Sequence, residues 1–558
     1  MATETPTTPI PAAAAVETQT PTPVETTSEA ITAPPAKADV PKKKKMIHLC
    51  FFDTCCAGNH MNAGQWKREG DSTKDKDKLP YWLWMAKLAE KGKITCIFLA
   101  DTYGGHEVYT GSMAPVLRGG TQAGFIDPFM VVSAMAGVTN NVSIAVTGST
   151  SYIPPNINAR AFSSLDHLSN GRIGWNIVTS FSKSAARAFG QKDVLSHDER
   201  YDMAEEYMQL MYKMWNGSWA DDAKVWDTVN NMAYNPEKTR KFKHEGKYFA
   251  FEGRHQSSPS PQRTPFLFQA GTSKSGMRFA ARHAEGIYTG GIKPEGTKDG
   301  IAAIRAQAAA MGRDPSTIKA FIGLSPVLGR TLEEAQAKFD LAVKHADAHA
   351  GLAQFCGYSG LDLSKFPFDE PLDVGKMEES GNAIHTIIRA LNEGDTSGLP
   401  WTPKRIGMFQ ALGGFHPMPV GTPEMVADEL ETWIDIADVD GFNIAYVSNP
   451  GSFEDVVELL VPELQKRGLM QTEYAVPGGT MRENLLRQPG QKKLRDDHFG
   501  SQFSWENWTP SGEEVVDSIK AENATAVKTG PKMDATEEKQ PTETVLPVQS
   551  TSETTVGA

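Results

Sequence analysis

Residues 142–179, which read VSIAVTGSTSYIPPNINARAFSSLDHLSNGRIGWNIVT, contain a strand–helix–strand unit that decides the fold class. The apolar run Val142–Thr147 predicts a buried strand, and Arg172–Thr179 predicts another. Asn156–Ser169, between them, has the pattern of a helix that ends before Gly171. Two buried strands joined by a helix are typical of a parallel sheet.

The same alternation of short apolar strands and amphipathic helices occurs eight times along the chain. Strands that are apolar throughout belong to parallel sheets covered by helices on both faces. Eight such units predict an α/β fold, a (β/α)8 TIM-like barrel. A doubly wound open sheet is the alternative, but no GxGxxG motif follows the first strand. The six other predicted strands are residues 46–53, 94–101, 265–270, 286–289, 321–328 and 441–447.

Aromatic residues mark the limits of the folded body. The 558-residue chain has 25 Phe, 13 Tyr and 11 Trp, yet none lies in residues 1–45 or 510–558. Segments so poor in large apolar groups cannot offset the entropy of ordering, so both are predicted to be disordered, low-complexity tails. One enlarged barrel domain is then expected over residues 46–509. Its insertions, at about 216–264 and 351–421, are expected on or near the functional face.

Charge and cysteine content exclude several classes of partner. The net charge is −12, and no basic stripe for nucleic acid occurs outside Lys42–Lys45. That lysine run is interpreted as part of a solvated tail, with a localisation or membrane-surface signal as the alternative. No apolar stretch approaches the roughly 18 residues of a membrane span, and no secretory signal is recognised. Five cysteines without a CxxC motif indicate a reducing compartment, so a cytoplasmic location is expected.

Polar residues stand at the carboxyl ends of three consecutive predicted strands, where barrel enzymes carry their active sites. Asp101 ends the second strand, Ser149 and Thr150 follow the third, and Asn176 and Ser180 lie at the end of the fourth. Each residue alone can be explained as a cap of the following helix. Three consecutive strands with polar ends together predict a site.

A loop of small residues, Ala270-Gly-Thr-Ser-Lys-Ser-Gly276, lies between a predicted strand and a predicted helix. Its backbone N–H groups can approach an anion closely. The helix dipole and the hydroxyls of Ser273 and Ser275 favour a phosphate there. A plain helix cap explains the same loop almost as well.

Two histidines lie in loops where catalytic groups are expected. His60 follows the first strand in CCAGNH, a place for a proton donor or an oxyanion stabiliser, and His416 lies in GGFHPMPVGTPE. A structural role suits either of them, and a nucleophilic Cys55-Cys56 with His60 lacks a flanking signature. His345 and His349 have helical spacing without the carboxylate of an HExxH motif, so no metal site is predicted.

Many collinear segments resemble the bacterial luciferase-like flavin-dependent monooxygenases, in the branch of nitrilotriacetate monooxygenase component A and dibenzothiophene sulfone monooxygenase. The similarity spans about residues 46–485 and leaves out the tails. Its segments are FLADTYG, the strand with TGSTSY, ARAFSSLDHLSNGRIGWNIVTS (159–180), AARAFG (185–190), HDERYDMAEEYM (197–208), SPQRTPFLFQAGTSKSGMRFAARHAEG (260–286), GTPEMVADEL (421–430), DGFN (440–443) and PGSFEDVVELLVPELQKRG (450–468).

The resemblance implies a TIM-like barrel with insertions that uses reduced FMN (FMNH2) as co-substrate. A separate NAD(P)H-dependent flavin reductase is expected to deliver it, in a transient complex or by diffusion. O2, the second co-substrate, adds to the reduced flavin to give a C4a-peroxyflavin, which oxygenates a small organic substrate. A lid is expected to shield this chemistry from water, and 351–421 is the candidate. The resemblance also implies a homodimer or higher homo-oligomer.

The resemblance assigns flavin-binding roles to residues of the matching segments. Asp101 matches an acidic residue near the flavin ring, and Ser149 or Thr150 matches a strand-end hydroxyl. Asn176 matches the asparagine of GWN. Tyr201, in HDERY, matches a tyrosine that helps hold the ribityl–phosphate chain.

The remaining candidates concern the phosphate and the reaction. Ser273 matches the phosphate-contacting serine of AGxSxxG, and Ser275 is the second hydroxyl of that loop. Ser180 lies where some members carry a histidine, so it is a candidate both for cofactor binding and for catalysis. His60 matches the region that faces the substrate, and His416 matches more loosely.

Other functions stay open at this point. A deazaflavin-dependent oxidoreductase on the same barrel would transfer hydride without oxygen. A non-catalytic flavin-binding protein would keep the barrel without the chemistry. A hydrolase would need paired carboxylates at strand ends, and only Asp101 can be placed there.

Overall fold

The computed structural model describes residues 45–372, 391–392, 395 and 397–510. Eight parallel strands form a closed barrel in the order β1-β14-β11-β10-β9-β4-β3-β2. This confirms the predicted (β/α)8 barrel, and closure excludes the open doubly wound sheet. The barrel strands are β1 His48–Thr54, β2 Cys96–Ala100, β3 Ser143–Ser149, β4 Ile173–Val178, β9 Phe266–Gln269, β10 Gly286–Thr289, β11 Lys319–Leu324 and β14 Gly441–Ala445.

Some predictions concern residues outside this described part of the chain. The predicted tails 1–45 and 510–558 lie outside it except for Lys45 and Pro510. The predicted insertion 351–421 is described except for residues 373–390, 393–394 and 396.

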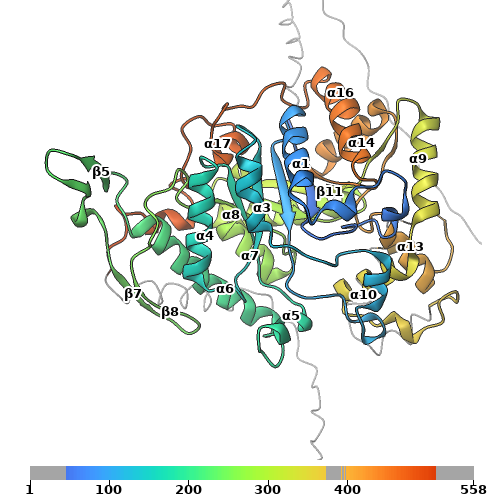
Figure 1. Ribbon diagram of the computed structural model, residues 1–558, viewed down its shortest axis with the longest axis horizontal. Helices are drawn as coiled ribbons and strands as arrows, with labels where there is room; N and C mark the ends of the chain where they lie inside the picture. The colour runs from blue at the N-terminus through green and yellow to red at the C-terminus, as the bar shows by residue number, and fades with distance from the viewer. Residues whose placement is uncertain (1–44, 373–390, 393–394, 396, 511–558) are drawn as a thin grey trace, which may run out of the picture. The chain divides into compact units, whose positions relative to one another are not determined.

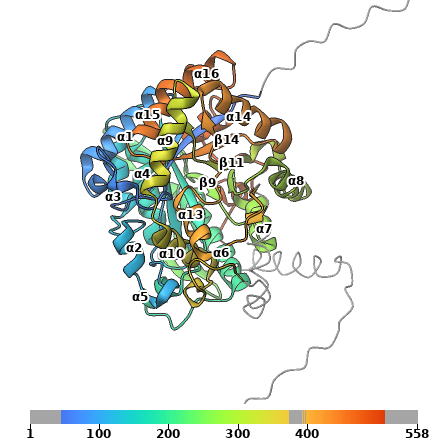
Figure 2. The same ribbon diagram turned by 90° about the vertical axis from the view of Figure 1, so that its right-hand side faces the viewer.

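Helices cover the outside of the barrel (Figures 1 and 2). Local signals fix their starts: Asp127 caps the helix that begins at Pro128, accepting a hydrogen bond from the backbone N–H of Phe129 at 2.9 Å. A π-helical turn at Val456–Leu460 lies between the helices Gly451–Asp455 and Val461–Lys466. The helices beside the strands are α1 Leu79–Lys91, α3 Pro128–Ala136, α4 Pro155–Leu168, α6 His197–Tyr212, α7 Lys274–His283, α8 Pro294–Ala310, α14 Pro423–Ala437, α15 Gly451–Asp455 and α16 Val461–Lys466.

Further elements follow the carboxyl ends of β2, β4 and β11. They are α2 Ala114–Gly119, α5 Lys183–Ala188, α9 Leu332–His345, α10 Ala348–Ser359, α13 Pro403–Ala411, and the strand pair β12 Val327–Leu328 and β13 Val420–Gly421. The α10 and α13 helices lie side by side in both views (Figures 1 and 2). The sequence predicts one helix over 332–350, which is wrong. Asp347 has extended backbone angles and caps α10 by accepting the N–H of Ala350, so the helix is divided in two.

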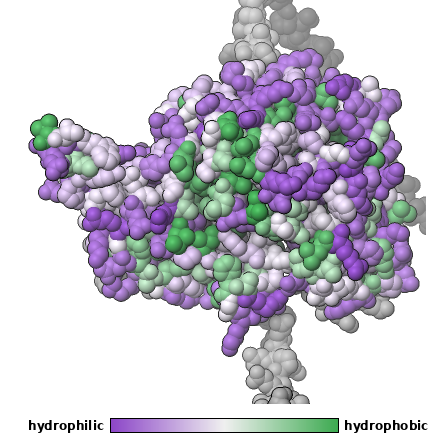
Figure 3. Space-filling view, viewed as in Figure 1, coloured by the Kyte–Doolittle hydropathy of each residue, from purple (hydrophilic) through white to green (hydrophobic). Residues whose placement is uncertain are grey.

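The segment 216–264 contains two antiparallel hairpins between α6 and β9. One pairs β5 Lys224–Asp227 with β6 Met232–Tyr234, and the other pairs β7 Phe242–Glu245 with β8 Ala250–Gly253. The β5 hairpin projects from the barrel (Figure 1). Its exposed side chains include Trp226 and Val229, and hydrophobic surface is visible at the end of this projection (Figure 3).

Stacked aromatic rings fill the barrel interior. The ring centroids of Phe268 and Tyr288 are 4.9 Å apart, those of Tyr288 and Phe98 are 4.3 Å apart, and those of Phe98 and Phe52 are 5.1 Å apart. Such offset rings combine large buried apolar area with favourable pair geometry. The stack runs through β9, β10, β2 and β1, and its last ring, Phe52, borders open space at the carboxyl ends of the strands.

A short helix, α17 Met481–Leu486, packs against the other end of the barrel. Met481 and Leu485 belong to the same buried cluster as the interior aromatic rings. Between them, the side chain of Arg482 is fully buried and its Nε lies 2.6 Å from Oε1 of Glu285, just before β10. This ion pair connects the helix to the amino-terminal ends of the strands.

Replacing Arg482 by Met is expected to lower the free energy of unfolding by about 3–5 kcal/mol, because Glu285 is left buried without its partner. Chemical denaturation measures this loss. The double variant Arg482→Met/Glu285→Leu is expected to recover most of it. Lys241→Ala, which removes an exposed pair with Glu252, is the control and is expected to cost less than about 1 kcal/mol. Equal losses of unfolding free energy in Arg482→Met and Lys241→Ala would contradict this account.

Candidate active site

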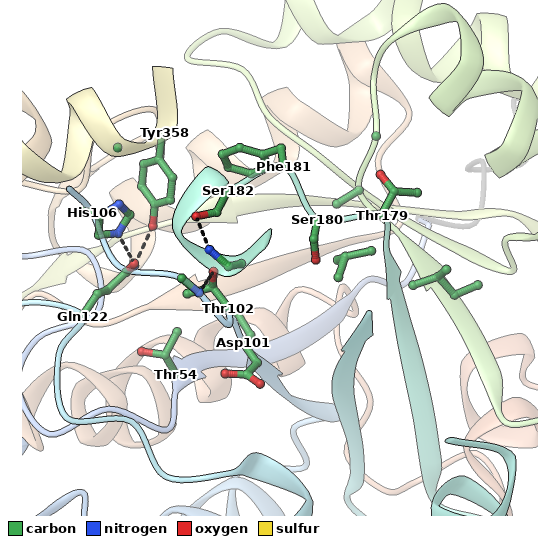
Figure 4. Close-up of a pocket in the computed structure, with 18 of the residues that line it drawn as sticks. Thr54, Asp101, Thr102, His106, Gln122, Thr179, Ser180, Phe181, Ser182 and Tyr358 are labelled. Atoms are coloured by element: carbon green, nitrogen blue, oxygen red, sulfur yellow. Dashed lines mark hydrogen bonds between the residues drawn. The ribbon is translucent and has the colours of Figure 1, made fainter. Parts of the chain in front are cut away.

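A cavity of about 500 Å³ opens at the carboxyl ends of the barrel strands. Its walls come from the ends of β1, β2, β4 and β9, from the segments that follow them, and from the end of α10 (Figure 4). This is the face on which barrel enzymes build active sites. Five of the predicted site residues line it: His60, Asp101, Ser180, Tyr201 and His416.

Two predicted residues contact this lining from behind. The hydroxyl oxygens of Ser149 and Ser180 are 2.9 Å apart. Ser273 is hydrogen-bonded to the hydroxyl of Tyr201. It also caps α7, because its Oγ accepts a hydrogen bond from the N–H of Gly276 at 3.1 Å. The cap and the contact with the cavity wall coexist at this serine.

Three predicted residues are engaged outside the lining. Asn176 donates to the hydroxyl of Thr147 at 2.9 Å, and its Oδ1 has no partner within the described chain. Thr150 donates to a carbonyl oxygen of β4 at 3.3 Å. Ser275 donates to the exposed carboxylate of Asp198 at 2.7 Å. The negative charge of Asp198 opposes a phosphate at the Ser275 hydroxyl.

The β4 side of the cavity, defined here as Thr179, Ser180, Tyr201, Gln269 and Gly271, is polar. The Tyr201 hydroxyl shares hydrogen bonds with Thr179, Gln269 and the α7 cap. Burial raises the pKa of Tyr201, so the hydroxyl stays protonated and able to donate. Gln269 is buried and its Oε1 has no partner among the described residues.

The backbone of the β4 side has two features that suit it to hold a ligand closely. Ser180 has φ 47°, in the left-handed region that a serine rarely adopts. At Gly271 an added Cβ would lie 2.2 Å from the Tyr201 hydroxyl oxygen, so only glycine allows the β9–α7 loop to pass so close.

The β1 side of the cavity, defined here as Phe52, His60, Met61, Tyr358 and His416, is mainly apolar and aromatic. The rings of His60 and Phe52 meet edge to face with centroids 4.3 Å apart, and the His416 ring lies 5.8 Å from Phe52. Burial lowers the pKa of His60 well below its usual value and that of His416 to about 4. Both imidazoles are therefore neutral at pH 7. The Nδ1 of each has no partner within the described chain.

A hydrogen-bonded group connects α10 with the loop that carries His60. Its members His106, Gln122 and Tyr358 lie together in Figure 4. Gln122 donates to the carbonyl oxygen of His60 at 3.0 Å and to the hydroxyl of Tyr358 at 2.6 Å. Its Oε1 lies 2.7 Å from Nε2 of His106. Gln354, on α10, donates to the same His60 carbonyl at 2.8 Å. These hydrogen bonds join the first loop and the insertion into one wall of the cavity.

A buried ion pair supports His60 from behind. The Nζ of Lys76 lies 2.6 Å from Oδ1 of Asp53, and both side chains are fully buried. Lys76 also donates to the hydroxyl oxygen of Tyr446 at 3.1 Å, and that oxygen accepts the backbone N–H of His60. Burial alone would lower the pKa of Lys76, but the carboxylate of Asp53 raises it overall. The positive charge of Lys76 is therefore balanced by the carboxylate of Asp53 behind the cavity wall.

Sequence reasoning missed several residues of this site, among them Gln269 and Arg200 on or beside the β4 side and Gln122 and Tyr358 at the α10 wall. Gln269 is the last residue but one of the predicted strand 265–270 and the last of β9, so the strand-end rule that selected Asp101 leads to this position once the true end of the strand is known. Arg200 precedes Tyr201, its guanidinium donates to the carbonyl of Ser180, and its Nε has no partner in the described part of the chain. Gln122 and Tyr358 come from segments without a recognisable pattern, and only the folded chain brings them together.

A (β/α)8 barrel with a cavity of this composition at the carboxyl ends of its strands defines a TIM-barrel enzyme. A family model described as luciferase-like monooxygenase matches residues 51–438. The chain belongs to the luciferase-like monooxygenase family and is an oxidoreductase that incorporates oxygen. The resemblance drawn from the sequence is confirmed.

Its relatives match over most of their own length. A dimethyl-sulfide monooxygenase of Hyphomicrobium sulfonivorans is 40% identical over 460 residues, 82% of this chain and 94% of the relative. A long-chain alkane monooxygenase of Geobacillus thermodenitrificans (strain NG80-2) is 40% identical over 459 residues, 82% and 98% of the two chains. The crystal structure of a riboflavin lyase with modified FMN and riboflavin superposes with a TM-score of 0.74 at 34% identity, covering 82% of this chain and 100% of that one.

Two kinds of feature are absent from the part of the chain that the structure describes. Within residues 45–372, 391–392, 395 and 397–510, no helix has the length and hydrophobicity needed to cross a membrane. The same residues contain no group of three or more His, Cys, Asp and Glu side chains arranged to hold a metal ion.

The carboxyl group of Asp101 gives this site a pH dependence. Burial raises its pKa to about 7, and Asp127 adds to the effect. In the unfolded chain an aspartate titrates near about 3.9. The folded state therefore binds this proton more tightly, and the stabilisation present below about pH 4 is lost as the pH rises through 7.

Asp101→Asn is expected to remove the loss of folding stability that accompanies deprotonation of Asp101. The melting temperature of the native protein should fall relative to that of the variant between pH 5 and pH 8, as measured by differential scanning calorimetry. Asp299→Asn, at an exposed position, is the matched control and should follow the native protein at every pH. Parallel curves for the native protein and Asp101→Asn would contradict a raised pKa at Asp101.

Proposed function

We propose that the protein is a two-component, FMNH2-dependent monooxygenase that oxygenates a small organic substrate. The observation that carries this proposal is the polar β4 side of the cavity, at the amino-terminal end of α7. Family membership supports it, and so does the riboflavin lyase structure, whose title names a modified FMN.

The residues present fit a flavin mononucleotide. The first turn of α7, with Ser273 and the close passage at Gly271, presents backbone N–H groups suited to a phosphate. Tyr201 donates from its protonated hydroxyl, and Arg200 adds a positive charge beside Ser180. The unpartnered Oε1 of Gln269 is an acceptor for a ribityl hydroxyl or a ring N–H.

The protein orients the flavin and excludes water from it. When bound, the reduced flavin supplies the oxygen chemistry, for which the family resemblance predicts a C4a-peroxyflavin. Asp101 holds or releases a proton near pH 7 at the end of β2. His60 and His416 stay neutral and face the substrate space, and Ser180 lines the β4 side. The α10 wall, through Tyr358, limits access of solvent.

The proposed reaction consumes O2 and FMNH2. One oxygen atom enters the substrate and the other leaves as water, with two electrons and two protons taken from FMNH2. A separate NAD(P)H-dependent flavin reductase regenerates FMNH2, in keeping with the absence of a dinucleotide fingerprint in this sequence. The names of the relatives, which specify dimethyl sulfide and long-chain alkanes, support a small organic substrate. The protein is further proposed to form a homodimer or a higher homo-oligomer.

The decisive experiment supplies the purified protein with NADH, FMN and a flavin reductase under 18O2. Candidate sulfides, sulfones, alkanes and aminopolycarboxylates are screened for a product that carries one 18O atom. Hydride transfer to a deazaflavin without O2 uptake would favour the deazaflavin alternative. Binding of FMN without any effect on flavin reoxidation or product would favour a non-catalytic flavin-binding protein.

Ser273→Ala is expected to raise the dissociation constant of FMN about tenfold, because one hydrogen bond worth ~1.4 kcal/mol is lost. Fluorescence titration of FMN measures this. Thr422→Ala is the matched control, since Thr422 caps α14 in the same way, remote from the cavity lining. Both variants lose a helix cap, but only Ser273→Ala should weaken FMN binding. Equal FMN affinity in the two variants would refute the phosphate assignment.

A further inference from the structure

The cavity wall carries no permanent positive charge. Among the described residues that line the cavity there is no lysine or arginine. The groups of the lining that can ionise are Asp101, two tyrosines and the imidazoles of His60, His106 and His416. Burial lowers the pKa of all three imidazoles, so at pH 7 they add no charge.

Three described cations near the cavity are engaged by other groups of the protein. Lys76, behind His60, is fully buried against the carboxylate of Asp53. Arg187 forms an exposed ion pair with Glu107 at 2.6 Å. Arg200 donates to the carbonyl of Ser180 on the β4 side, the side assigned above to the flavin. Among the described residues, an anionic substrate on the β1 side would therefore find no counter-ion.

Desolvation makes this arrangement selective. A carboxylate that leaves water for a buried site is strongly disfavoured unless a cation or several donors receive it. The β1 side offers instead aromatic and thioether surface, from Phe52, Met61 and Tyr358. The unpartnered Nδ1 atoms of His60 and His416 can satisfy one uncharged polar group of a ligand.

We propose that the substrate of this site is an uncharged, mainly apolar molecule with at most a weakly polar reacting group, and that carboxylate anions are excluded. The proposal rests on the proposed function, because it assigns the β4 side to FMN and the β1 side to substrate. The surface offered by Phe52 and Met61 recognises the apolar body, and neutral His60 and His416 meet the polar group.

Three sulfides of one skeleton test the charge preference. They are dimethyl 3,3′-thiodipropionate, which is uncharged, the 3,3′-thiodipropionate dianion, and bis(3-aminopropyl) sulfide, a dication at pH 7. Binding to the FMN-loaded protein is measured by saturation-transfer NMR and isothermal titration calorimetry. The diester is expected to bind at least about tenfold more tightly than either ion. Equal or tighter binding of either ion, including no measurable preference, would overturn the proposal.

A charge introduced at Met61 tests the location. Met61→Lys places an ammonium group on the β1 side, and Met61→Gln is the uncharged control of similar length. Met61→Lys is expected to bind the dianion at least about tenfold more tightly than Met61→Gln does. An unchanged ratio in folded protein, checked by thermal melting, would contradict this location. Should Met61→Lys fail to fold, the three-sulfide comparison on the native protein still decides the substrate class.

FMN binding and flavin reoxidation distinguish an error in the substrate class from an error in the proposed function. A native protein that does not bind FMN would contradict the proposed function. A protein that binds FMN, accelerates its reoxidation and prefers the dianion would contradict only the substrate class.

Discussion

Stacked rings of Phe268, Tyr288, Phe98 and Phe52 occupy the interior of the barrel, and the placement of the site depends on them. Closing eight parallel strands leaves an interior that side chains must fill. Because large rings fill it from within, the free volume is displaced to the carboxyl ends of the strands. Phe52 is the last ring of the stack and the first wall of the cavity, so core packing and ligand contact share one residue.

In the wall behind the same cavity, two buried charged groups are paired with each other and do not face a ligand. The Lys76–Asp53 pair lies behind His60, and it positions the backbone of that residue through Tyr446. A lone lysine there would seek solvent or a ligand, and a lone aspartate would oppose a reduced, electron-rich flavin. Because the two are paired, the loop stays rigid and the β1 side remains electrically neutral. The Lys76–Asp53 pair thus accounts both for the fixed position of the His60 loop and for the neutrality of the β1 side.

The sequence was sufficient for the barrel because hydrophobic runs and helix starts are local properties. All eight strands follow from apolar runs such as 94–101, and strand ends identified Asp101 and Ser180. The break at Asp347 was missed, since the Ala-rich segment around it keeps a helical pattern. Gln122 and Tyr358 were missed because their contact depends on an insertion folding back over the first loop. Tertiary contacts of that kind have no period or motif to reveal them.

The two sides of the cavity differ in a way that bears on selectivity. Hydrogen-bond donors and a nearby cation gather at the β4 side, whereas the β1 side has aromatic surface and neutral imidazoles. An anionic cofactor and an uncharged substrate would therefore be sorted by solvation as much as by shape. A phosphate on the β1 side would lack partners, and an apolar molecule on the β4 side would leave the buried Oε1 of Gln269 without a donor. Each wrong arrangement carries its own desolvation cost, so the site can orient both molecules without a charged residue in its substrate half.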